Sequence, residues 1–121
     1  MAKNLEISLL LDFYGPVLTE KQRELAEQYY NDDFSLAEIA QNEGITRQGV
    51  RDAIKRAEQQ MLEMEESLGM VKRFREIGNE VAQIAVAAGE IAQKNRAAGG
   101  GEEITRLAEQ IQKKAASIQE N

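Results

Sequence analysis

Apolar residues recur at every third or fourth position along most of the chain, which is the period of an amphipathic α-helix. The first such pattern ends at Gly15-Pro16, a pair typical of the end of a helix. The apolar face of this helix consists of five residues: Leu5, Leu9, Leu10, Phe13 and Tyr14. We therefore expect a first helix that begins near residue 5 and ends near residue 14.

Two capping boxes mark the beginnings of the next helices. Thr19 with Gln22, and Ser35 with Glu38, have the required spacing. In a capping box the hydroxyl accepts the third backbone N–H, and the third side chain reaches back to the cap residue. The boxes predict a second helix that ends near Tyr30 and a short third helix after residue 35.

The fourth helix is predicted to continue beyond the length of a compact domain. Its apolar residues alternate in spacings of four and three, as a and d positions of a coiled coil do. They are Val50, Ile54, Ala57, Met61, Met64 and Leu68. After Gly69 a second series has the same alternation: Phe74, Ile77, Val81, Ile84, Ala88 and Ile91. Either the two series form a dimer surface or they fold back on each other as an antiparallel hairpin about Gly69.

A Gly-rich break at residues 97–101 separates a last apolar series from the rest: Ile104, Leu107, Ile111, Ala115 and Ile118. Together these patterns predict an all-α protein with a compact helical head, residues 1–57, and a long helical tail, residues 58–121. The tail is the expected hairpin or coiled-coil dimer surface.

Composition excludes several classes of function. The 121 residues contain no Cys and no His, so there is no thiolate nucleophile, disulfide or His-based metal site. No Gly-rich phosphate loop or nucleophile–base pair is recognisable. We therefore expect no enzyme activity, no cofactor, no metal and no small-molecule substrate. The longest apolar run, residues 84–89, is far shorter than the roughly 18 residues that span a bilayer. Since no signal-peptide pattern is visible either, we expect a cytoplasmic protein without membrane insertion.

The segment from residue 34 to residue 57 has the layout of a helix-turn-helix, with Gly44 at the turn and Thr46 as the cap of the second helix. At 100° per residue the apolar side of that helix faces the third helix. The opposite side carries residues that suit base edges, since Arg pairs with guanine and Gln with adenine. The expected nucleic-acid contacts are Thr46, Arg47, Gln48, Arg51, Lys55 and Arg56. The free N–H groups at the start of the helix suit a phosphate.

Charge favours the same segment. Residues 45–57 hold four basic residues and one acid, a net charge of +3 in a chain whose total is −6. An acidic body with one basic patch predicts weak affinity for non-specific DNA. The alternative is a solvated helix surface, in which Asp52 pairs with Arg56 four residues on. A second basic cluster, Lys72, Arg73 and Arg75, is interpreted as structural, with an RNA-backbone contact as the alternative.

Several short motifs in order resemble the small bacterial family called YlxM. They are Leu18-Thr19-Glu20-Lys21-Gln22, Tyr29 to Ala40, and Ile45 to Asp52 with Ile54-Lys55-Arg56. Residues 35–57 are also similar to the helix-turn-helix of sigma-factor region 4. The resemblance covers residues 5–68. It implies a helix-turn-helix protein associated with the signal recognition particle pathway, with contacts at Thr46, Arg47, Gln48, Arg51 and Lys55. Gly49 departs from the Ala expected there.

The sequence thus predicts a nucleic-acid-binding regulatory or accessory protein that docks through the second helix of its helix-turn-helix. Its target is DNA or signal recognition particle RNA, and the tail makes it a homodimer. The alternative is a protein–protein interaction module that uses the same scaffold without reading nucleic acid.

Overall fold

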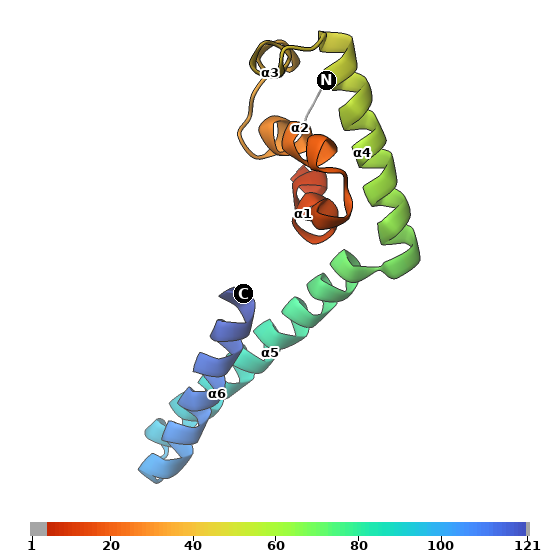
Figure 1. The fold of residues 1–121 in the computed structure, drawn as a ribbon. Helices are drawn as coiled ribbons and strands as arrows, with labels where there is room; N and C mark the ends of the chain where they lie inside the picture. Colours follow the sequence, from red (N-terminus) through yellow and green to blue (C-terminus); the bar gives the residue numbers. More distant parts are fainter. Residues whose placement is uncertain (1–4, 121) are drawn as a thin grey trace. The chain divides into compact units, whose positions relative to one another are not determined.

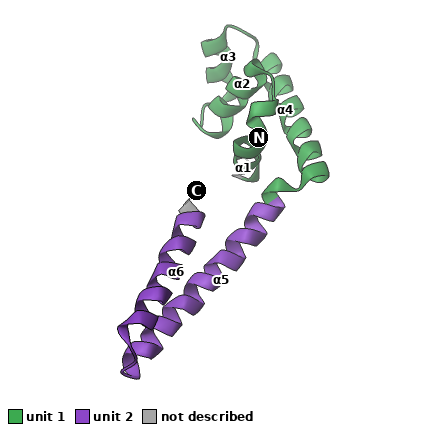
Figure 2. Cartoon of the chain, turned by 60° about the horizontal axis from the view of Figure 1, so that its bottom comes forward, with its two compact units in different colours: residues 1–71 green, residues 72–121 purple. Residues whose placement is uncertain are grey.

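The computed structural model describes residues 5–120, with the side chains of residues 6–119, so the predicted inward position of Leu5 lies outside the described side chains. Within this range the fold is all-α, as the periodicity predicts (Figure 1). The helices are α1 (Leu5–Tyr14), the 3₁₀ helix η1 (Gly15–Val17), α2 (Glu20–Tyr30), α3 (Leu36–Glu43), α4 (Arg47–Leu68), α5 (Met70–Ala97) and α6 (Glu102–Glu120). They form two compact units, a head unit up to residue 71 and a hairpin unit from residue 72 (Figure 2).

The helix beginnings are those that the capping boxes predict. The Thr19 hydroxyl accepts the Gln22 N–H at 3.1 Å, and the Gln22 side chain accepts the Thr19 N–H at 3.2 Å. Ser35 and Glu38 make the same reciprocal pair, with both distances 3.1 Å. Two of the N–H groups that a helix start leaves without an intrahelical acceptor are thereby satisfied in each helix.

The head unit has two clusters of buried side chains that share α2 and α4. One joins α1 to the middle of α4 and includes Tyr14, Ala57 and Met61. The other joins α2, α3 and the beginning of α4, and its fully buried members are Leu25, Ile39, Val50 and Ile54. Because α4 contributes to both clusters, it fixes the position of the helix-turn-helix on the rest of the head unit.

The head unit extends beyond the residue 57 at which the sequence pattern placed the division. Met61 has no exposed surface and Val71 is 5% exposed, and both belong to the cluster that contains Tyr14. The packed part of α4 therefore runs past the helix-turn-helix, and the compact unit ends after Val71.

Tyr14 and Glu65 hold the point where α4 ends and α5 begins. Gly69 ends α4 in the left-handed region with φ of 61°. The Tyr14 hydroxyl donates to Glu65 Oε1 at 2.6 Å and accepts the Met70 N–H at 3.2 Å, while Glu65 Oε1 also accepts the Val71 N–H at 3.0 Å. The first N–H groups of α5 thus find acceptors on α1 and α4, which satisfies backbone groups that the helix start leaves without an intrahelical acceptor.

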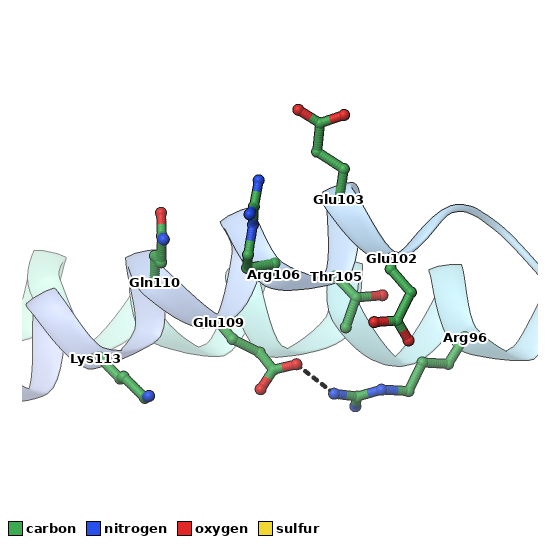
Figure 3. A pocket seen from close by; sticks show the side chains of 8 residues that line it. All are labelled: Arg96, Glu102, Glu103, Thr105, Arg106, Glu109, Gln110 and Lys113. Carbon is green, nitrogen blue, oxygen red and sulfur yellow. Dashed lines mark hydrogen bonds and ion pairs between the residues drawn. The ribbon is translucent and has the colours of Figure 1, made fainter.

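The hairpin in this structure joins α5 to α6, and its turn follows residue 97 at the predicted Gly-rich break (Figure 2). Asn95 Nδ2 donates to the Gly101 carbonyl at 2.7 Å and to Thr105 Oγ1 at 2.9 Å, which closes the turn. Near the same end, Arg96 on α5 forms an ion pair with Glu109 on α6 (Figure 3). The fold-back therefore uses the Gly-rich break and not Gly69.

Small residues make the contact between α5 and α6. Those that are buried are Val81, Ala88, Ala92, Thr105, Ala108 and Ala115. Of the predicted second a/d series only Val81 and Ala88 are among them, while Phe74, Ile77, Ile84 and Ile91 are 42–52% exposed. The predicted series is therefore not packed as a whole within one chain, and the alternative of a dimer surface stays a prediction for these four residues. At Gly89 the end of the Gln112 side chain occupies the space beside the glycine, because a Cβ there would be 2.7 Å from Gln112 Nε2.

Candidate nucleic-acid interface

The helix-turn-helix consists of α3, a three-residue turn and the first half of α4. Gly44 ends α3 with φ of 66°, a left-handed conformation that favours glycine. Ile39 on α3 and Val50 and Ile54 on α4 have no exposed surface, so the two helices share a dry contact. Lys21 on α2 pairs with Glu43 at 3.1 Å, which ties the end of α3 to the head unit.

The predicted contact residues lie on the exposed side of α4. Arg47, Gln48, Arg51 and Lys55 are all exposed. At 3.6 residues per turn they span about 100° of the helix surface, centred about 90° from the buried Val50 and Ile54, with Arg47 nearest to that buried side. We call these four residues the basic face.

A shallow hollow of about 310 Å³ lies on the basic face. Arg47, Gln48 and Arg51 line it from α4, and Leu36 lines it from the first position of α3. Leu36 is not among the contact residues that the sequence predicts. Its half-buried side chain adds an apolar contact, of the kind that a thymine methyl group makes, beside three donors.

Thr46 contributes to this surface as the cap of α4, at whose start backbone N–H groups are exposed. Its hydroxyl accepts the Gly49 N–H at 2.9 Å, as its predicted role as N-cap requires. The N–H groups of Arg47 and Gln48 also precede the first intrahelical acceptor, so they point out of the helix start beside the hollow. Such N–H groups, at the positive end of the helix dipole, favour an anion such as a phosphate.

The remaining polar residues divide around the edge of this surface. Gln48 Nε2 donates to Asp52 Oδ1 at 2.9 Å, so the amide is oriented by a carboxylate one turn further along α4. Arg56 is exposed but lies about 100° round the helix from Lys55, outside the basic face. The structure thus brings Arg47, Gln48 and Arg51 together, sets Lys55 one turn beyond them, and separates Arg56.

Electrostatics distinguish this surface from the rest of the head unit. Residues 45–57 carry a net charge of +3, whereas the other residues up to 71 carry three basic residues against thirteen acids. A polyanion would be repelled by most of the head unit and attracted at the basic face alone.

Other parts of the described chain offer less chemistry. A polar hollow of about 730 Å³ near the hairpin turn is lined by eight residues, among which Arg96 and Glu109 pair with each other (Figure 3). Among the described residues, no group of three or more acidic side chains is placed to hold a metal ion. None of the described helices is long and apolar enough to cross a membrane.

Comparison with known proteins agrees with the helix-turn-helix geometry. Residues 1–97 match the model of the UPF0122 family, described as "Putative helix-turn-helix protein, YlxM / p13 like". A UPF0122 protein of Thermoanaerobacter sp. strain X514 is 53% identical over 78 residues, which cover 64% of this chain and 67% of the relative. A UPF0122 protein of Acetivibrio thermocellus is 48% identical over 84 residues, covering 69% and 72%, respectively. For one from Halalkalibacterium halodurans the identity is 44% over 85 residues, covering 70% and 78%.

Proposed function

We propose that this chain, which belongs to the YlxM / p13-like family of helix-turn-helix proteins, binds nucleic acid through the basic face of α4. The observation that carries the proposal is the convergence of Arg47, Gln48 and Arg51 on one hollow at the start of an exposed helix. A helix-turn-helix reads a groove with the N-terminal residues of its second helix, which are these residues.

The contacts divide by chemistry. Arg47, Gln48 and Arg51, with Leu36 beside them, take the base-edge contacts, because their donors and one apolar group converge. Lys55 and the N–H groups at the helix start take backbone phosphates, which position the protein without reading sequence. Arg56 adds a phosphate contact at the margin, and Thr46 keeps its cap while exposing those N–H groups.

The target is duplex DNA or signal recognition particle RNA. The link to the signal recognition particle rests on the resemblance to the YlxM family, and it makes the protein a regulatory or accessory component of that pathway in the cytoplasm. An A-form major groove does not admit a helix, so RNA would be gripped through its backbone or an opened loop. A groove-reading helix fits B-form DNA directly. In either case the protein acts by binding and not as an enzyme.

A protein-docking role is the second candidate, and Asp52 favours it. This exposed carboxylate lies beside the basic face and holds Gln48. A partner protein with acids opposite the basic face and a base opposite Asp52 would pair with such a mixed surface, whereas Asp52 would repel a polyanion.

The test is binding of the full-length chain to signal recognition particle RNA and to a duplex-DNA pool at two salt concentrations. Wild type is compared with Arg51→Glu/Lys55→Glu. We expect the double variant to lose binding, and the salt dependence of any residual binding to fall by roughly 0.9 in log–log slope per lost phosphate contact on duplex DNA.

The matched control is Arg106→Glu/Lys113→Glu, which makes the same change in net charge on exposed residues of α6. This variant should bind as wild type does. Equal losses in both double variants would show that net charge alone governs binding, and no binding by wild type to either nucleic acid would favour the protein-docking role.

A further inference from the structure

One side of the hairpin unit exposes a run of large aliphatic side chains. Seven of them are between 45% and 54% exposed: Ile77, Ile84 and Ile91 on α5, and Ile104, Leu107, Ile111 and Ile118 on α6. Single exposed aliphatic residues are common on protein surfaces, but a contiguous set of this size marks an interaction site. We call these seven residues the aliphatic face.

Helix geometry places the two halves of the aliphatic face on the same side of the hairpin. On α5 the three isoleucines lie about 60° from the buried Val81, Ala88 and Ala92. On α6 the exposed residues lie about 80° from the side that packs on α5, and because the helices are antiparallel the two rotations lead to one side. Ile77 and Ile118 line the same groove, of about 600 Å³, at the open end of the hairpin.

The contact between α5 and α6 does not bury enough apolar surface for a stable unit of this size. Its buried residues are mostly alanines, and the unit runs only from residue 72 to residue 121. Units of about 50 residues usually need a disulfide, a metal or association to be stable. The chain has no Cys or His, so association remains.

The spacing of the aliphatic face identifies the kind of partner. Residues 77, 84 and 91 are seven apart, and so are residues 104, 111 and 118. A seven-residue apolar repeat is the pattern of helix-on-helix packing with side chains interlocked between helices. Each set is also symmetric about its central isoleucine, so a twofold axis through that residue opposes isoleucine to isoleucine along that helix.

Charge selects a second copy over a partner of one charge sign. The hairpin unit carries eight basic residues against seven acids, so a second hairpin is not repelled. Exposed residues of both signs border the aliphatic face, Arg73 and Glu80 on α5 and Glu103 and Lys114 on α6. A surface that carries both signs at its rim is suited to pairing with itself across a twofold axis.

We propose that the aliphatic face binds the aliphatic face of a second copy of this chain, so that two hairpins form an antiparallel four-helix bundle. Ile84 and Ile111 are the central isoleucines of this face on α5 and on α6. The face is about 28 Å long and two helices, or ~20 Å, wide, a flat footprint of roughly 560 Å², compared with the ~800 Å² that each partner contributes to a standard stable interface. This inference does not depend on nucleic-acid binding, but it gives the assembly two basic faces.

The first test is sedimentation equilibrium of the full-length chain over a wide range of concentration. Wild type should have twice the 13.5 kDa mass of one chain. Ile84→Glu/Ile111→Glu should have the single mass. Val86→Glu is the matched control, because Val86 is 63% exposed on the same helix but about 160° round from Ile84. This variant should remain a dimer.

A second test applies if the double variant fails to fold. The natural chain has no Cys, so Ile84→Cys and Ile111→Cys each introduce a unique thiol. A short bis-maleimide should link two chains of either variant into a dimer and leave Val86→Cys as single chains. The proposal is overturned by a wild-type chain of single mass at every concentration, by a dimer that survives Ile84→Glu/Ile111→Glu, or by equal linking at Val86. Each of these readouts is made without nucleic acid, so its failure is distinct from a failure of the proposed function.

Discussion

Tyr14 shows how one buried side chain can satisfy polar groups where one helix ends and the next begins. It is 1% exposed, and its hydroxyl is bonded to Glu65 and to the N–H of Met70. Burial, together with the hydrogen bond to Glu65, raises the pKa of the Tyr14 phenol above its usual value of 10.0. The folded state therefore holds the phenol proton more tightly than the unfolded chain does.

This pKa shift predicts how stability depends on pH. Since the unfolded chain loses the phenol proton first, the contribution of Tyr14 is complete below pH 10.0 and is lost as the pH rises through the higher folded-state pKa. In urea unfolding from pH 7 to pH 11, the free energy of unfolding of wild type should fall as the pH rises. This fall should be smaller in Tyr14→Phe. The phenylalanine variant should be less stable at pH 7, because Glu65 and Met70 lose a partner.

Tyr30→Phe is the control for this experiment, because Tyr30 is half-buried in the same unit and has no part in the bonds at Glu65 and Met70. Above pH 10 the free energy of unfolding of Tyr30→Phe should fall as much as that of wild type. If Tyr14→Phe and Tyr30→Phe follow identical curves, the bonds at the end of α4 do not govern the alkaline loss of stability.

At the scale of the element, one glycine at a turn and one inside a helix are predicted to respond to alanine substitution with opposite changes in stability. Gly44 has φ of 66°, so Gly44→Ala forces a side chain into the left-handed region at a cost of roughly 1–2 kcal/mol. Gly78 lies inside α5, and a Cβ there meets nothing within 4 Å. Gly78→Ala should therefore stabilise α5 by about 1 kcal/mol through helix propensity.

Chemical denaturation followed by far-UV circular dichroism measures both substitutions. The midpoint should fall for Gly44→Ala and rise for Gly78→Ala. Two shifts of the same sign would contradict the assignment of one glycine to a turn and the other to a helix interior.

The helix starts and the helix-turn-helix could be predicted because each depends on residues near one another in sequence. Each cap depends on residues within a single turn of helix: Thr19 with Gln22, Ser35 with Glu38, and Thr46. The structure has all three caps. Likewise Val50 and Ile54 are the most apolar residues of their helix face and are fully buried.

The packing of α5 could not be predicted in this way because both of its candidate faces are apolar. An a/d assignment made from the sequence follows the large residues such as Ile84. In the structure α6 packs instead on Ala88 and Ala92, whose small side chains let two helices approach. Which face is chosen depends on the partner helix, whose register is set by Asn95 and Thr105 across the turn. Leu36 was missed for the same reason, since its place in the hollow depends on α4.

At the scale of the whole molecule, charge is distributed unevenly between the units. Up to residue 71 the chain carries seven basic residues and fourteen acids, while the hairpin unit is nearly neutral. Attraction to a polyanion is thus restricted to the basic face, and a single head unit should bind a random duplex weakly and lose that binding with added salt. Affinity useful to a cell then requires either a matched site or a second head unit.

The second head unit leads to a prediction that combines both proposals. Two basic faces in one assembly make the second contact intramolecular, which commonly raises overall affinity by 10²–10⁴ when a target offers both sites. Ile84→Glu/Ile111→Glu should therefore lose affinity for a selected two-site target by a factor in that range, while its affinity for a single site changes little. Arg51→Glu/Lys55→Glu should lose both affinities and still sediment at twice the chain mass. Equal affinity of the dimer and the Ile84→Glu/Ile111→Glu chain for the two-site target would mean that pairing through the aliphatic face serves stability alone, because each head unit would then bind independently.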